Sequence, residues 1–261
     1  MIGKLLKYDF KKMTKILVYI YIASIVLSSL TRFVNIWKDI QAVFILGQVF
    51  AGITYSAIGS VLINTFVHIL KVFVSSFYKD ESYLTHTLPV SKSKLLLSKF
   101  ISSVLVILCS VVVCFLSLFI MFYSKSFASA LVQFIKVTVS GFNLPVGVFI
   151  LIFALIIFFQ ICAIICMAFT AVVMAYRHGE KRILKGLCYF AVFYFGSLVA
   201  TVICAIAVFA VGGMLNQLLA SVMTQKAFIT LLILAIVCYV LYFFIFYFIC
   251  KKAFQKGVNV D

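Results

Sequence analysis

The segment at residues 146–176 reads VGVFILIFALIIFFQICAIICMAFTAVVMAY and contains no charged side chain. A helix needs about 20 consecutive apolar residues to cross the hydrocarbon core of a bilayer. A strand of a membrane barrel alternates apolar and polar residues, and this segment does not alternate. The segment therefore predicts a transmembrane helix and indicates an all-α membrane protein.

Five further segments have the same character. With the first, the predicted spans cover residues 16–33, 43–77, 100–123, 146–176, 187–211 and 228–250. The whole chain is 66% hydrophobic and 11% charged, whereas about a quarter of a soluble domain is charged. At 1.5 Å per residue the second span would extend roughly 50 Å. We therefore expect the second and fourth spans to project beyond the bilayer or to break. Residues 1–261 are predicted to form a single transmembrane domain.

Residues 1–15 have the pattern of an amphipathic helix. Apolar residues recur at helical spacing between lysines, and they are Ile2, Leu5, Leu6, Phe10 and Met13. Such a helix lies in the headgroup region of a membrane with its apolar side down. We therefore expect an interfacial helix before the first span. The alternative is that these residues are only a charged flank of that span.

The basic residues predict the orientation of the spans. Seventeen of them lie in residues 1–15, 71–99, 177–185 and 251–256, which fall on one side of a six-span arrangement. Five lie on the other side: Arg32, Lys38, Lys125, Lys136 and Lys226. Lys and Arg accumulate on the cytoplasmic side of membrane proteins. Both termini are therefore predicted to be cytoplasmic.

The net charge of +16 raises the question of a nucleic-acid partner. The basic residues occur in short clusters between apolar runs, and a nucleic-acid interface needs a continuous basic surface. Orientation signals and contact with anionic membrane lipids explain such clusters. We expect membrane lipids as a partner and no nucleic acid.

Motifs for enzyme chemistry are missing from the sequence. It lacks the phosphate-binding pattern of Gly, four residues, Gly, Lys and then Ser or Thr, so we expect no ATP hydrolysis on this chain. It also lacks the HExxH zinc motif and the GxSxG nucleophile turn. Cys162 and Cys166 have no His or carboxylate nearby to complete a metal site. We expect free thiols, no enzyme activity, and no catalytic, cofactor or metal residues.

All six acidic residues fall outside the centres of the predicted spans. Carriers that couple transport to protons or sodium ions usually need ionisable groups within the membrane. The sequence offers no such carboxylate, which argues against self-powered secondary transport. An intramembrane protease would need paired glutamates and histidines within its spans, and these are also missing.

Polar residues follow one face of the second span. Ser56, Ser60, Asn64 and His68 are spaced by four residues, and polar groups in a span avoid lipid. They either line a substrate path or subunit seam, or make hydrogen bonds within one helix bundle, and the sequence leaves both possibilities open. Gln160 in the fourth span is a second candidate for lining a path.

Three serines of the third span, Ser103, Ser110 and Ser117, recur at heptad spacing. Small hydroxyl side chains at such a period are typical of close helix packing. We interpret these serines as structural.

The connection between the second and third spans, residues 78–99, contains signals for a short helix. Asp80 and Glu81 can cap a helix over residues 82–88, and Pro89 would end it. Its apolar side chains are Tyr83, Leu84 and Leu88. A short helix with apolar side chains on a cytoplasmic connection is a candidate docking element for a soluble partner.

Residues 80–91, DESYLTHTLPVS, resemble a loop of the permeases of bacterial type-2 ABC exporters, and residues 6–12, LKYDFKK, resemble the beginning of the same permeases. The resemblance implies an export permease subunit of a bacterial plasma membrane that forms a dimer with a second copy or a paralogue. It implies that residues 78–99 form a coupling loop to separate ABC ATPase subunits, which bind ATP and Mg. Residues 1–15 would be the interfacial helix of such a permease. The alternative function is an unpowered secondary carrier or channel.

Overall fold

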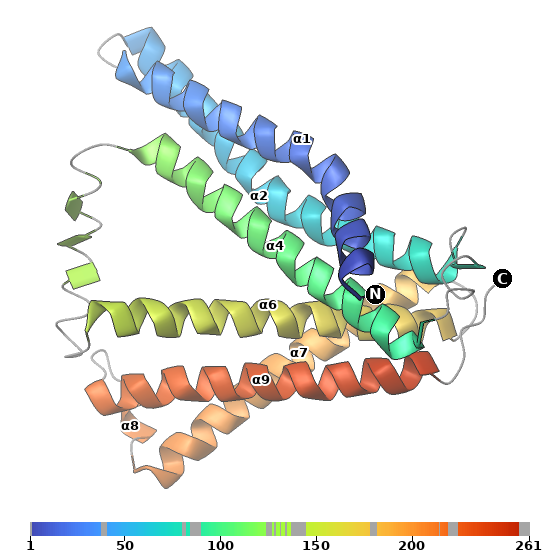
Figure 1. Cartoon of the computed structure of the whole chain (residues 1–261). Coiled ribbons are helices and arrows are strands. Elements are labelled where there is room, and N and C mark those ends of the chain that lie inside the picture. The colour runs from blue at the N-terminus through green and yellow to red at the C-terminus, as the bar shows by residue number, and fades with distance from the viewer. Residues whose placement is uncertain are drawn as a thin grey trace. The chain divides into compact units, whose positions relative to one another are not determined.

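The computed structural model describes residues 2–37, 41–79, 82–83, 90–123, 127, 129–130, 132–133, 135–136, 145–177, 182–213, 215–218 and 224–255. All regular secondary structure in this part of the chain is helical (Figure 1). The helices are α1 (Ile2–Ile36), α2 (Gln41–Tyr78), α4 (Lys92–Phe122), α6 (Val146–Arg177), α7 (Arg182–Val211), α8 (Leu215–Leu218) and α9 (Gln225–Gln255). Six of them are long and apolar enough to cross a membrane. The predicted all-α, multi-pass class is confirmed.

The helices are longer than the apolar segments that predicted them. Helix α2 has 38 residues, which corresponds to a length of about 57 Å at 1.5 Å per residue. It is continuous, so of the two expected outcomes for the second span, a break does not occur and projection beyond a bilayer remains. Helix α6 is also continuous, with 32 residues.

Residues 2–15 are the first turns of α1, which continues without interruption to Ile36. The sequence predicted an interfacial helix and then a separate span, and the structure joins them into one helix. No Pro or Gly lies between residues 4 and 36 to interrupt the backbone hydrogen bonds. Whether the first turns lie at a membrane surface stays a prediction.

The chain divides into two compact units, residues 1–129 (unit 1) and residues 130–261 (unit 2). Unit 1 contains α1, α2 and α4, and unit 2 contains α6, α7 and α9 (Figure 1). Within each unit the first and third long helices run parallel, and the second runs antiparallel to both. Each unit is therefore a small helical bundle that repeats the same order of helix directions.

Hydroxyl side chains hold the three helices of unit 1 together. Ser110 Oγ of α4 lies 2.6 Å from Tyr21 Oη of α1 and 2.8 Å from Thr65 Oγ1 of α2. Thr31 Oγ1 and Thr54 Oγ1 lie 2.6 Å apart between α1 and α2. The heptad serines of α4, Ser103, Ser110 and Ser117, are fully buried. Their predicted role in close helix packing is confirmed.

In unit 2, α6 packs against both α9 and α7. Thr170 Oγ1 of α6 donates a hydrogen bond to the main-chain oxygen of Phe246 on α9 at 3.0 Å. Tyr242 Oη of α9 lies 2.9 Å from Thr201 Oγ1 of α7. Helix α7 ends before Gly213, whose φ of 63° is in the left-handed region that favours glycine. The hydrogen bonds of Thr170, Thr201 and Tyr242 pair hydroxyl groups within the bundle, as polar groups in a lipid environment require.

Candidate functional site

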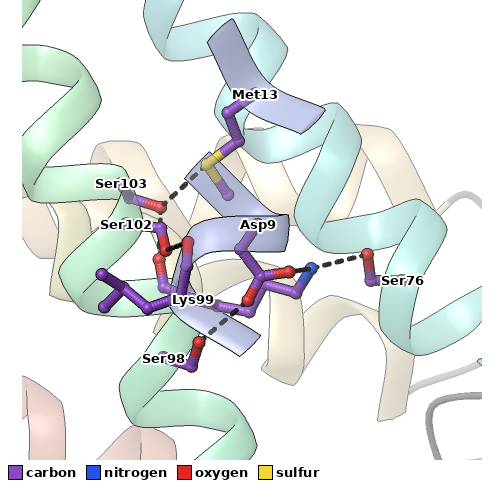
Figure 2. A network of polar contacts seen from close by, with 8 residues as sticks. Asp9, Met13, Ser76, Ser98, Lys99, Ser102 and Ser103 are labelled. Carbon is purple, nitrogen blue, oxygen red and sulfur yellow. Dashed lines mark hydrogen bonds and ion pairs between the residues drawn. The ribbon is translucent and has the colours of Figure 1, made fainter. Parts of the chain in front are cut away.

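A buried ion pair lies where α1, α2 and α4 meet at one end of unit 1 (Figure 2). Lys99 Nζ is 2.6 Å from Asp9 Oδ1, and the two side chains are only 7% and 3% exposed. Ser98 Oγ donates a hydrogen bond to Asp9 Oδ2 at 2.9 Å. Lys99 Nζ also donates to Ser76 Oγ at 3.0 Å. We call Asp9, Ser76, Ser98 and Lys99 the polar cluster.

The helix register explains why Asp9 points into unit 1. Asp9, Met13 and Leu17 are spaced by four residues and are all buried, so they share one face of α1. Lysines on the other faces of the same segment, such as Lys7 and Lys11, are exposed. Asp9 therefore lies on the apolar side of the predicted amphipathic helix, where a single charge requires a partner.

Two longer contacts continue along the same seam between α1 and α4. Ser103 Oγ lies 4.0 Å from Met13 Sδ, and Ser102 Oγ lies 3.5 Å from the main-chain oxygen of Leu6 (Figure 2). Both distances are at the limit for hydrogen bonds. The short bonds of the cluster are therefore the ones that fix the beginning of α1 against α4.

The electrostatics of the cluster favour a paired, charged state. Burying one isolated charge is costly, and this cost is offset only by a close partner with good hydrogen bonds. Both carboxylate oxygens of Asp9 accept hydrogen bonds, and the Lys99 ammonium uses at least two of its three donors. Removing either partner would leave the other charge buried and uncompensated. The cluster therefore links three helices through two charges that depend on each other.

The structure describes only part of the predicted coupling residues. Tyr83 is 75% exposed. Its neighbour Ser82 is buried, and the Ser82 N–H donates to the main-chain oxygen of Lys79 at 2.7 Å. The other predicted coupling residues lie outside the described residues, and they are Asp80, Glu81, Leu84, Leu88 and Pro89. The loop that contains Tyr83 leaves α2 and enters α4 next to the polar cluster.

The polar residues predicted on α2 do not bond to α1 or α4. Ser56 Oγ donates to the Ile53 oxygen at 2.8 Å, and Asn64 Nδ2 donates to the Ser60 oxygen at 2.9 Å. Both side chains are exposed. Ser60 Oγ likewise donates within α2, to the oxygen of residue 57. Thr54, Thr65 and Ser76 make side-chain hydrogen bonds from α2 to α1 or α4. Thr54 and Thr65 lie on a different face from Ser56, Ser60 and Asn64. The path or seam interpretation of the stripe stays a prediction.

The two remaining candidates are half-buried. His68 of α2 has a buried Nε2 atom that lacks a hydrogen-bond partner among the described residues. Gln160 lies on α6 in unit 2. The described residues contain no group of three or more His, Cys, Asp or Glu side chains that could hold a metal ion, and all eight cysteines are free thiols.

Sequence reasoning missed the polar cluster, although a signal was present. Asp9 falls four residues after Leu5 and four before Met13, so it belongs to the apolar face of the segment and not to the lysine face. Lys99 follows the apolar run Leu95–Leu97 by two residues. An acidic residue on an otherwise apolar helix face indicates a buried charge that needs a partner, but it does not identify that partner.

Comparison with known proteins gives no relative: no family model, no curated protein and no solved structure matches the chain. The class of protein therefore follows from the fold and the site alone. The described residues form an all-helical protein with six helices suited to cross a membrane. A buried ion pair joins α1 to α4, and Lys99 of this pair also bonds to α2.

Proposed function

We propose that the chain is the membrane-spanning permease subunit of an ABC exporter in a bacterial plasma membrane. Separate ABC ATPase subunits bind ATP and Mg, and a second permease copy or a paralogue completes the membrane part. The observation that carries the proposal is residues 80–91, DESYLTHTLPVS, between α2 and α4. This sequence resembles the ATPase-contacting loop of type-2 exporter permeases.

The described part of the loop supports a docking role. Tyr83 exposes most of its side chain, although it follows a buried serine. Leu84 follows Tyr83 in the sequence, and exposed apolar side chains that form a contiguous patch are typical of a surface that binds a partner. Closure of the ATPases on ATP would displace this loop and favour one of two states of the permease pair.

Through the polar cluster, a displacement of the loop would be transmitted to α1, α2 and α4. Ser76 lies in the last turn of α2, and Ser98 and Lys99 lie in the second turn of α4. The loop between these positions is therefore anchored at its base. A force on the loop acts on three helices together.

The alternative function is an unpowered secondary carrier or channel. One observation favours it: in each unit the first long helix packs against both the third and the second, and internal repeats occur in many secondary transporters. Against a coupled carrier, Asp9 is the one acidic residue among the described residues, and Lys99 neutralises it. Ion-coupled carriers rely on ionisable groups that can release or bind the coupling ion.

Co-expression with the ATPase encoded in a neighbouring reading frame tests the proposal. We expect a stable complex in mild detergent and a higher rate of ATP hydrolysis in the complex than in the ATPase alone. A permease that elutes without the ATPase, and moves solute in vesicles that lack any ATPase, would establish the alternative.

A further inference from the structure

We propose that Asp9 is the positioning residue of the coupling loop: it holds both ends of residues 78–99 against the beginning of α1. The role of the loop in coupling rests on the proposed function, whereas the positioning itself is a property of this chain alone. The polar cluster carries the inference (Figure 2).

The α4 side of the loop contacts the Asp9 carboxylate directly, and the α2 side reaches it through Lys99. On the α4 side, Ser98 Oγ donates to Asp9 Oδ2 at 2.9 Å. On the α2 side, Ser76 Oγ accepts from Lys99 Nζ at 3.0 Å, and the same ammonium group contacts Asp9 Oδ1 at 2.6 Å. The contact between Ser76 and Lys99 joins α2 to α4 at the base of the loop, and Asp9 ties this base to α1.

The link between the base of the loop and α1 is non-covalent, and it includes the buried Asp9–Lys99 ion pair. Helices α2 and α4 are joined by the loop, but α1 reaches the loop only through side chains. Moving α1 away from α4 at this end would expose or strand two buried charges, which is the costly outcome for a buried pair. Residues 2–15 of α1 therefore follow any displacement of the loop base.

A contact at the other end of unit 1 provides a matched comparison. Thr31 and Thr54 join α1 to α2 through hydroxyl groups 2.6 Å apart, and both side chains are fully buried. This pair is neutral and lies far along α1 from the loop. If the polar cluster only stabilised the bundle, the loss of either contact would have the same kind of effect on the loop.

The test measures the loop position in the isolated protein. In a variant without native cysteines, spin labels are placed at Lys4→Cys and Tyr83→Cys, both exposed positions. A control pair at Leu30→Cys and Phe119→Cys reports on the opposite end of α1 and α4, where both side chains are also exposed. Distance distributions are compared for Asp9→Asn, Lys99→Met, Asp9→Leu/Lys99→Met, Asp9→Lys/Lys99→Asp and Thr31→Val/Thr54→Val.

For the wild type we expect a narrow distribution of distances between positions 4 and 83. Asp9→Asn, Lys99→Met and the neutral double variant Asp9→Leu/Lys99→Met should broaden this distribution, while the control pair keeps its distance. The charge-swapped variant should recover the narrow distribution, and the threonine variant should never lose it. Because the neutral double variant leaves no stranded charge, it reports on the loop even if a single variant fails to fold. A distribution in the neutral double variant as narrow as in the wild type would overturn the proposal.

A second measurement separates this inference from the proposed function. In the complex with the ATPase, Asp9→Asn should reduce the stimulation of ATP hydrolysis, and Thr31→Val/Thr54→Val should not. If no ATPase binds the wild-type chain but the spin-label distances change as expected, the positioning role stands and the ABC function is wrong. If the ATPase binds and is stimulated equally by Asp9→Asn, the ABC function stands and the position that Asp9 gives to the loop is not needed for coupling.

Discussion

Lys99 and Asp9 are 90 residues apart in the sequence, and their charged groups are 2.6 Å apart in the structure. Neither side chain has appreciable contact with solvent. This pair is a defined point of attachment between the beginning of α1 and the beginning of α4. Each charge stabilises the other, so the loss of one leaves the other buried without a partner.

We predict that the single variants Asp9→Leu and Lys99→Met are much less stable than the double variant. Breaking a buried pair by removing one partner typically costs about 3–5 kcal/mol, whereas replacing both partners with apolar residues is often neutral. Melting temperatures in mild detergent, with the amount of monodisperse protein, measure this difference. Equal melting temperatures for the single and double variants would mean that the charges do not depend on each other.

Ser110 should tolerate loss of its hydroxyl group better than an increase in its size. Ser110→Ala removes hydrogen bonds to Tyr21 and Thr65, which we expect to lower the free energy of unfolding by about 1 kcal/mol. Ser110→Leu should cost about 1–3 kcal/mol more, because the position is fully buried. Ser29→Ala, an exposed serine bonded to its own helix, is the control and should leave the melting temperature unchanged.

Asn64→Leu tests whether the stripe on α2 is a path or a subunit seam. Asn64 is exposed and bonds only within α2, so its loss should leave insertion and melting temperature intact. If the stripe contacts a second subunit or lines a path, association of permease copies or transport should fall. Subunit association is read from the elution volume in detergent, with Ser29→Ala again as control. Normal association together with normal transport would remove the basis for the path and seam interpretation.

The orientation prediction rests on the distribution of basic residues. Lys92 and Lys181 should face the cytoplasm, and Lys125 and Lys226 should face outward. Single cysteines at these four positions, in a variant without native cysteines, can be labelled in intact cells with a reagent that does not cross membranes. Labelling at 125 and 226 alone agrees with the prediction, and labelling at 92 but not at 125 reverses the orientation.

The spans could be predicted because an apolar run of bilayer length has few other stable environments. Their ends could not, because hydropathy reports the bilayer core and not the helix. The third span was predicted from residue 100, but α4 begins at Lys92 and carries three lysines in its first turns. Residues 1–15 differ from the next segment in charge, yet the backbone of α1 is continuous across both.

In the candidate site, too, one part could be proposed from the sequence and another part could not. The loop was recognisable because its residues are contiguous in the sequence. The Asp9–Lys99 pair depends on two helices placing distant residues together, and no local pattern encodes that distance. The face on which Asp9 lies was predictable from its spacing to Leu5 and Met13. Its partner was not.

The most direct test of the central claim is the effect of the loop on a separate ATPase. Tyr83→Asp/Leu84→Asp would be purified with the ATPase of the neighbouring reading frame, and Tyr83→Phe would be the conservative control. Burial of one such side chain contributes about 1.5–3 kcal/mol, so we expect the double variant to bind the ATPase at least about tenfold more weakly. Tyr83→Phe should bind and stimulate hydrolysis as the wild type does. Undiminished binding and stimulation by Tyr83→Asp/Leu84→Asp would contradict the account.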